Sequence, residues 1–126
     1  MKAFQHSAAA LAFVWIAGCA SSPSSTSFPD GARTPTAAEL QAVLTGKSFS
    51  FSTPRGNVRS DYAAQGNGLT IFFPGGSDTG TWRTEDGRVC MDLRKQGAVC
   101  NDIRLVGSEL YQKRSTGDVV KSTPVK

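Results

Sequence analysis

The sequence predicts a mainly β domain, a small antiparallel meander or barrel-like fold, with one short N-terminal helix. Apolar and polar residues alternate in short runs over much of the chain, and Gly, Pro, Asn and Asp separate these runs at short intervals. The stretch just before the first run has helical spacing instead. Short strands punctuated in this way are typical of a β meander or a small barrel.

The helix is expected to begin at a capping box formed by Thr36 and Glu39. The Thr36 hydroxyl can accept a hydrogen bond from the Glu39 amide, while the Glu39 carboxylate reaches back to the amide of Thr36. Three apolar residues then share one face at helical spacing: Leu40, Val43 and Leu44. Gly46 suits a left-handed helix end, and a helix of about two turns needs a sheet to pack against.

After Gly46 the apolar period becomes two, because Phe49 and Phe51 alternate with serines. Strands are expected at 48–52, 58–62, 69–73, 80–84, 88–93, 99–105 and 109–113. Val119 and Val120 are candidates for a further strand. The folded domain is therefore expected over residues 36–121, followed by a short tail over 122–126.

The N-terminus carries the pattern of a bacterial lipoprotein signal peptide over residues 1–18. Lys2 supplies a positive charge, an apolar run follows over 8–16, and the small residue Gly18 precedes Cys19. These residues resemble a lipobox, where lipoprotein signal peptidase cuts after the cysteine thiol has received diacylglycerol. An ordinary secretory signal with an incidental cysteine is the alternative. The apolar run itself is too short to span a bilayer.

Fatty acyl chains on Cys19, palmitate among them, are expected to hold the mature chain on a membrane, because a multiply acylated cysteine exceeds the two-chain threshold for stable anchoring. Ala20 follows Cys19, whereas an Asp there would resemble an inner-membrane retention signal. We therefore expect an outer-membrane protein that faces the periplasm. Residues 19–35 are rich in Ser, Thr, Pro and Ala, and they are expected to form a disordered, lipidated tether.

Cys90 and Cys100 remain as an even pair once Cys19 carries lipid, and an exported chain folds where disulfides form. If these two residues face each other across a hairpin, Arg88 stands opposite Asp102, which pairs opposite charges. Alternation then gives this hairpin a core face of Val89, Met91, Leu93, Val99, Ile103 and Leu105, with Asn101 as the polar exception. A disulfide closing so short a loop stabilises by about 3 kcal/mol in the chain-entropy model, so we interpret it as structural rather than redox-active.

Composition argues against several function classes. The only histidine, His6, lies in the signal peptide, so the mature chain has no imidazole for general-base catalysis or metal ligation. With the remaining cysteines in a disulfide, we expect no catalytic residue, no metal and no cofactor. The excess of 14 basic over 10 acidic residues is mild and the basic residues are scattered, so nucleic acid is not an expected partner.

Three residues are candidate ligand contacts. Phe72 is expected to be exposed, because its neighbours on both sides belong to the apolar face of their strand; packing beneath the helix is the alternative. Trp82 is expected in the core. Arg94 and Lys95 are the closest approach to a basic patch. Phe72, Arg94 and Lys95 are therefore the side chains that we expect to meet a ligand.

Several short motifs between Leu44 and Tyr111 carry a family resemblance. They comprise the start Leu44, Thr45 and Gly46, the run Gly80, Thr81 and Trp82, the segment Asp86 to Cys90, and then Cys100, Ile103, Gly107, Glu109 and Tyr111. This pattern resembles small secreted proteobacterial domains of unknown function with a Gly-Thr-Trp and two-cysteine core. The resemblance implies a compact β fold and no activity. The chain departs from the pattern at Asn101, where such domains often carry an aromatic residue.

The sequence therefore favours an anchored envelope lipoprotein that acts as a non-catalytic binding or structural module. Its expected partners are the membrane, through lipid on Cys19, and an envelope polymer or protein. Inhibition of lysozyme-like enzymes is the alternative, because small disulfide-bonded β lipoproteins include such inhibitors. A basic domain gains no electrostatic steering toward basic lysozymes, which weighs against that alternative.

Overall fold

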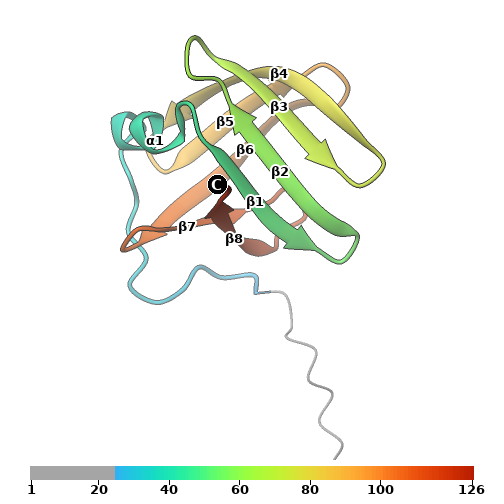
Figure 1. The fold of residues 1–126 in the computed structure, drawn as a ribbon. Coiled ribbons are helices and arrows are strands. Elements are labelled where there is room, and N and C mark those ends of the chain that lie inside the picture. The colour runs from blue at the N-terminus through green and yellow to red at the C-terminus, as the bar shows by residue number, and fades with distance from the viewer. Residues whose placement is uncertain (1–24) are drawn as a thin grey trace, which may run out of the picture.

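Antiparallel strands joined in chain order close into an eight-stranded barrel, with the last strand paired to the first (Figure 1). The computed structural model describes residues 25–126, so the predicted signal peptide and Cys19 lie outside the described residues. The elements are α1 (Ala37–Leu44), β1 (Ser48–Thr53), β2 (Gly56–Tyr62), β3 (Gly68–Phe73), β4 (Gly76–Glu85), β5 (Arg88–Leu93), β6 (Gly97–Val106), β7 (Glu109–Lys113) and β8 (Val119–Pro124). The predicted fold class is confirmed, as a closed barrel. Within residues 25–126, no helix is long and apolar enough to cross a bilayer.

The prediction of a C-terminal tail over 122–126 is wrong, because strand β8 extends into these residues. It runs through Pro124, which stands opposite Phe49 of β1, and the Val125 amide donates to the Ser48 carbonyl at 2.9 Å. The side chains there are mostly polar, so alternation gave no signal. Backbone pairing between the two end strands closes the barrel and leaves no open sheet edge.

The helix forms where the capping pattern predicts it. The Glu39 amide donates to the Thr36 hydroxyl at 3.1 Å, which is one half of the capping box. The Glu39 carboxylate instead pairs with Arg33, so the reciprocal half is absent. Leu40 and Leu44 are buried in the barrel core, and α1 lies across one end of the barrel in Figure 1. The helix therefore acts as a plug at that end.

The prediction of a disordered tether is wrong for residues 25–35, because hydrogen bonds hold this segment against the barrel. The Val119 amide donates to the Ser25 carbonyl at 2.7 Å, and Arg33 exchanges two backbone hydrogen bonds with Leu105, of 2.8 and 3.0 Å. Pro35 is fully buried, with its carbonyl accepting from Gly87. The tether was predicted from the scarcity of apolar side chains in this segment. Such a composition does not reveal hydrogen bonds between its backbone and other strands.

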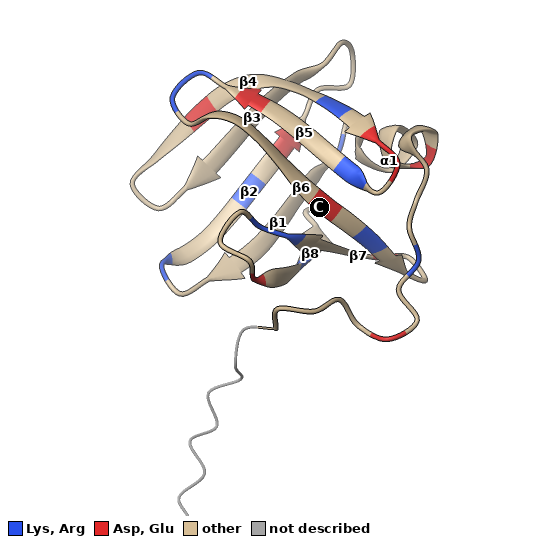
Figure 2. Cartoon of the chain, turned by 180° about the vertical axis from the view of Figure 1, so that it is seen from behind, with Lys and Arg blue, Asp and Glu red and all other residues tan. Residues whose placement is uncertain are grey.

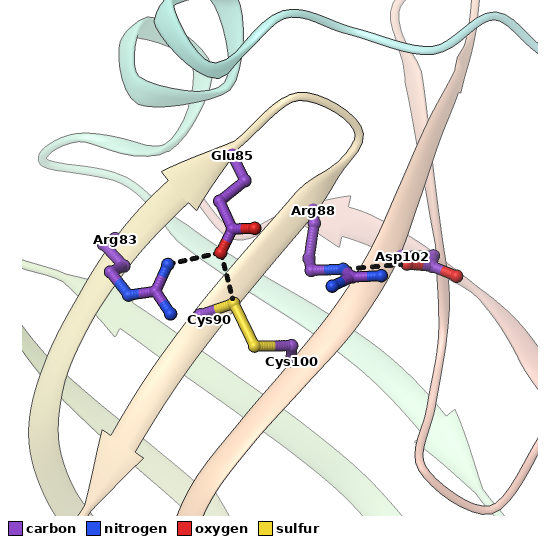
Figure 3. Close-up of a disulfide and its surroundings, with 6 residues drawn as sticks. All are labelled: Arg83, Glu85, Arg88, Cys90, Cys100 and Asp102. Carbon is purple, nitrogen blue, oxygen red and sulfur yellow. Dashed lines mark hydrogen bonds and ion pairs between the residues drawn. A yellow bond between two sulfur atoms is a disulfide. The ribbon is translucent and has the colours of Figure 1, made fainter.

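The β5–β6 hairpin has the predicted register and the predicted disulfide between Cys90 and Cys100. Figure 3 shows the bond on the outer face of the hairpin, beside the ion pair of Arg88 with Asp102. The turn at 94–96 and the inward alternation of the predicted core face are also confirmed.

Close packing of two strands explains why the Gly-Thr-Trp run begins with a glycine, Gly80. A Cβ added at Gly80 would lie 1.9 Å from the carbonyl oxygen of Asp92 on β5, so any other residue would push the two strands apart. Trp82 follows two residues later on the same inward face, and it is buried as predicted, with 3% exposure.

The outer surface carries interspersed charges. Figure 2 shows basic and acidic residues alternating along the strands rather than gathering by sign. Several form exposed ion pairs, such as Arg59 with Asp61 and Lys121 with Glu109. Exposed pairs of this kind contribute little to stability, so the core and the backbone ladders hold the barrel together.

Candidate ligand-binding cavity

The two ends of the barrel differ. The plug helix α1 covers one end, where the apolar core is fully packed around Leu40 and Trp82. The other end, which we call the mouth, is formed by the four hairpin turns that join β1 to β2, β3 to β4, β5 to β6 and β7 to β8. An eight-stranded barrel is just wide enough for side chains to fill it or for one small ligand to enter.

A cavity of about 360 Å³ extends from the mouth into the barrel. Its apolar lining comes mainly from β2, β3, β5 and β6, through Val58, Ile71, Phe73, Met91, Leu93 and Val99. Its polar lining includes Ser60, Asn101, Gln112 and Arg114, three of which belong to β6, β7 and the turn after β7. The cavity is therefore two-sided, with a largely apolar wall and a polar stripe.

Asn101 is the most unusual residue of the polar stripe. Its side chain points into the barrel with 8% exposure, and its Oδ1 has no hydrogen-bond partner among the described residues. A buried acceptor without a partner costs about 1–3 kcal/mol. The register of β6 and β7 pairs Asp102 with Lys113, so the next positions on the inner face bring Asn101 beside Arg114.

Arginines stand at the mouth. The Arg114 guanidinium lies 3.0 Å from the Asp118 carboxylate and 5.3 Å from the centre of the Phe51 ring, which fixes it at the cavity entrance. Hydrogen bonding from Thr116, followed by the Arg114 charge, holds the pKa of Asp118 below its usual value against the effect of burial. Arg55, in the β1–β2 turn, also lines the cavity and makes no ion pair with the residues of the described range.

Tyr62 marks the lower limit of the cavity. Its ring packs edge-on against Trp82, with centroids 4.9 Å apart, and against Phe49. Burial raises the pKa of Tyr62 to about 12, so its phenol is neutral at physiological pH. Beyond Tyr62, away from the mouth, lies a space of about 10 Å³ that shares Ser60 and Gln112 with the main cavity. This is about the volume that a single water molecule needs.

Asp78 holds one side of the mouth in place through hydrogen bonds to the β5–β6 turn. This residue is only 2% exposed, and its carboxylate accepts hydrogen bonds from the amides of Thr79, Lys95 and Gln96 at 2.9 to 3.1 Å. Burial acts to raise the pKa of Asp78, but the three amides and the nearby Lys95 charge together outweigh it and lower the pKa. Asp78 therefore ties the β5–β6 turn to β4.

No protein-family model, no curated protein and no solved structure matches the chain. The resemblance to small secreted proteobacterial domains therefore stays a prediction. The assignment of a function rests on the geometry of the barrel.

The three predicted ligand contacts lie outside the cavity. Phe72 is exposed, at 42%, on the outer face of β3, where the Arg59 guanidinium lies 5.4 Å from its ring centre. Arg94 and Lys95 belong to the β5–β6 turn, and the Lys95 ammonium donates to the Ser77 carbonyl at 3.0 Å. A contact of these residues with a ligand remains a prediction about the outer surface.

Sequence reasoning missed the cavity residues for identifiable reasons. Asn101 was recognised as a polar residue on the core face, but a single amide did not indicate a site. Arg55 and Arg114 are scattered turn arginines in the sequence, and only the barrel topology brings both to one mouth. Gln112 faces inward two residues before Arg114, and this inward amide beside a turn arginine is the signal that could have been used.

Potential metal ligands gather at one place within residues 25–126, outside the cavity. Glu85, Cys90 and Cys100 bring a carboxylate and two sulfur atoms within 4.8 Å of one another. Both sulfur atoms belong to the disulfide, and the Glu85 carboxylate lies 3.3 Å from Cys90 Sγ while it pairs with Arg83 (Figure 3). A disulfide sulfur is not a thiolate ligand, so this arrangement is a structural contact.

Proposed function

We propose that the chain is a non-catalytic binding module that holds one small, partly apolar molecule inside its barrel. The observation that carries the proposal is the cavity of about 360 Å³ behind the mouth. Its volume falls in the range of known small-molecule sites, about 300–1,000 Å³, and such sites combine apolar walls with a few polar groups. The two-sided lining fits that description.

The cost of the cavity supports a binding role. Side chains that line an empty space lose dispersion contacts on one side, and an unpaired buried amide adds a further penalty. The packed end of the same barrel shows that this sequence can fill its interior with Leu, Val and Trp side chains. An unfilled half is therefore better explained by an occupant than by poor packing.

The lining also supports binding over catalysis. Hydroxyl, amide and guanidinium groups line the cavity, while the described lining residues include no carboxylate, imidazole or thiol. Acid–base and nucleophilic catalysis depend mainly on those three groups. Hydroxyls and amides instead orient a bound molecule through hydrogen bonds.

The proposal places this module in the cell envelope, anchored by lipid on Cys19 and facing the periplasm. The signal-peptide pattern supports that location, as does the disulfide, because such bonds persist in oxidising compartments. Anchoring would restrict the module to ligands of the membrane surface and the neighbouring space.

A pair of neighbouring tryptophan substitutions on β6 tests the binding proposal. Val99 points into the cavity and Ala98 points outward, so Val99→Trp fills the site and Ala98→Trp leaves it open. We expect saturable one-to-one binding of the neutral fluorophore N-phenylnaphthylamine to the mature Cys19→Ser protein, measured by calorimetry. Val99→Trp should weaken it by about tenfold or more, a change of about 1.4 kcal/mol.

The Ala98→Trp variant is the matched control and should bind as the parent protein does. Circular dichroism verifies that both variants keep the β fold. Absence of saturable binding to the parent protein, or equal affinity in the two tryptophan variants, would overturn the proposal.

A further inference from the structure

We infer that the occupant of the barrel is an acyl-chain amphiphile that carries a carboxylate next to a hydrogen-bond donor, as an N-acyl amino acid does. This inference rests on the proposed function and adds the ligand class. Three properties of the cavity lead to it: the apolar wall, the unpaired acceptor of Asn101 and the positive mouth.

The apolar wall requires a hydrocarbon portion. Ile71 and Phe73 of β3 and Met91 and Leu93 of β5 present alkyl, aromatic and thioether groups to the cavity without a polar atom that needs a partner. Methionine adapts its shape to flexible chains. Burial of a hydrocarbon against this wall supplies the non-directional part of the affinity.

The amide of Asn101 requires a donor on the ligand. Asn101 lines the cavity, and its buried Oδ1 has no hydrogen-bond partner in the described wall. A ligand N–H or O–H at this point would remove the penalty. A ligand without a donor there would keep it, which gives the site a means of discrimination.

The mouth requires an anionic group. Arg55 and Arg114 line it, and Asp118 pairs with Arg114 alone, so these three residues sum to one positive charge. Arg114 contacts Asp118 through Nη1, and a guanidinium has five N–H donors, so donors remain for a second carboxylate. A carboxylate is the planar partner that arginine binds best.

Because Asn101 and Arg114 are neighbours across two strands, one ligand can carry both the donor and the acid. Asn101 and Arg114 follow the cross-strand pair Asp102 and Lys113, and side chains opposite each other on neighbouring strands start about 5 Å apart. The amide N–H and the carboxylate of an N-acyl amino acid are separated by a single carbon, so one ligand of this class can present both groups to this neighbouring pair of residues. The acyl chain then extends along the apolar wall.

Three ligands that differ by one feature each test this inference. They are N-octanoylglycine, its N-methyl analogue, which lacks the amide hydrogen, and its methyl ester, which lacks the charge. With the mature Cys19→Ser protein, we expect N-octanoylglycine to bind about tenfold more tightly than either analogue, measured by calorimetry.

Variants assign each preference to its residue. Asn101→Leu should abolish the preference for the amide hydrogen, whereas Asn57→Leu, on the outer face of β2, should keep it. Arg114→Gln should reduce the preference for the free acid, whereas Arg94→Gln, outside the cavity, should not. Because Arg114→Gln leaves Asp118 without its partner, Arg55→Gln provides a second test at an exposed residue.

The possible outcomes separate this inference from the proposed function. Equal affinity for the three ligands, combined with fluorophore binding that Val99→Trp weakens, would overturn the ligand class and leave the binding role standing. A preference for the acid that Asn101→Leu does not alter would overturn the role of the donor. Failure of both the fluorophore and the acylglycine to bind would overturn both proposals.

Discussion

Asp78 shows how one buried carboxylate can fix the shape of the cavity entrance. It joins β4 to the β5–β6 turn through backbone amides of Lys95 and Gln96, and Gln96 in turn lines the cavity. A carboxylate held by several N–H donors is stable in its charged form. The entrance is therefore set by a charge that the protein stabilises internally.

This arrangement predicts acid sensitivity with a definite sign. The pKa of Asp78 is lowered in the folded state, so its contribution to stability is present above the unfolded pKa of about 3.9 and is lost as the pH falls through the lower folded value. Asp78→Asn should lower the melting temperature at neutral pH by a few degrees. The difference from the parent should shrink below about pH 3.9, measured by thermal denaturation across pH.

Asp92→Asn is the matched control, because Asp92 is exposed on the neighbouring strand. Its melting temperature should follow that of the parent at each pH. A gap between Asp78→Asn and the parent that stays constant down to the lowest pH would show that the charge of Asp78 does not stabilise the fold.

At the same scale, sequence reasoning succeeded where a pattern was local. Trp82 in the core and Phe72 on the surface follow from alternation along their strands. Asp78 bonds to residues 17 or more positions away, and the alternation that marks Asn101 as a polar core-face residue does not show the cavity beside it. Residues whose role is set by distant backbone therefore escaped prediction.

The plug helix is the element on which the closed end of the barrel depends. Leu40 has no exposed surface, and the Thr84 hydroxyl donates to the Ala37 carbonyl at 2.9 Å, so side-chain packing and a hydrogen bond hold α1 to β4 and the core. An isolated helix of this length is unstable in water. Tertiary packing therefore stabilises it.

Truncation of the plug should destabilise the whole barrel. Leu40→Ala removes a fully buried side chain and should cost about 2–5 kcal/mol, which lowers the melting temperature by about 10 °C or more. Gln41→Ala, on the exposed side of the same helix, should change it little. Equal melting temperatures for the two variants would mean that α1 does not unfold together with the barrel.

Among the elements, those with alternation or capping signals were predicted closely. Strands β5 and β7 begin and end where expected, and the helix begins after Thr36. Strand β4 starts earlier than expected because Ser77 and Thr79 give it a polar outer face around the buried Asp78. A sequence marks the start of a strand poorly when the inward-facing residue there is also polar, because apolar and polar residues then do not alternate.

Closure of the barrel is a property of the whole molecule that the sequence left open as meander or barrel. It depends on pairing between β1 and β8, which lie at opposite ends of the folded chain. The cavity also arises at this scale, since it reflects the sum of side-chain volumes around eight strands. No single segment encodes either property.

The N-terminal segment predicts how an anchored barrel is oriented. The Ser25 carbonyl accepts a hydrogen bond from Val119, the first residue of β8 after a mouth turn, and Ser25 lies six positions after Cys19. Such a length spans at most about 20 Å. A fluorophore at Arg55→Cys, in the mouth, should be quenched by nitroxide-labelled lipids more strongly than one at Ser108→Cys, at the plug end.

The measurement uses lipidated protein on vesicles, with Cys19→Ser as the control that should leave the vesicles and lose quenching at both sites. Equal quenching at the two positions would contradict the orientation. Persistent membrane binding of Cys19→Ser would contradict the anchor itself.

The combination of one entrance and a plugged opposite end has a kinetic consequence. A molecule that enters past Arg55 and Arg114 has to leave by the same route, because α1 and the packed core block any passage through the barrel. Under the proposed function the protein cannot serve as a conduit. It would load, hold and unload one molecule at a time, so the residence time in the barrel would set the rate of exchange.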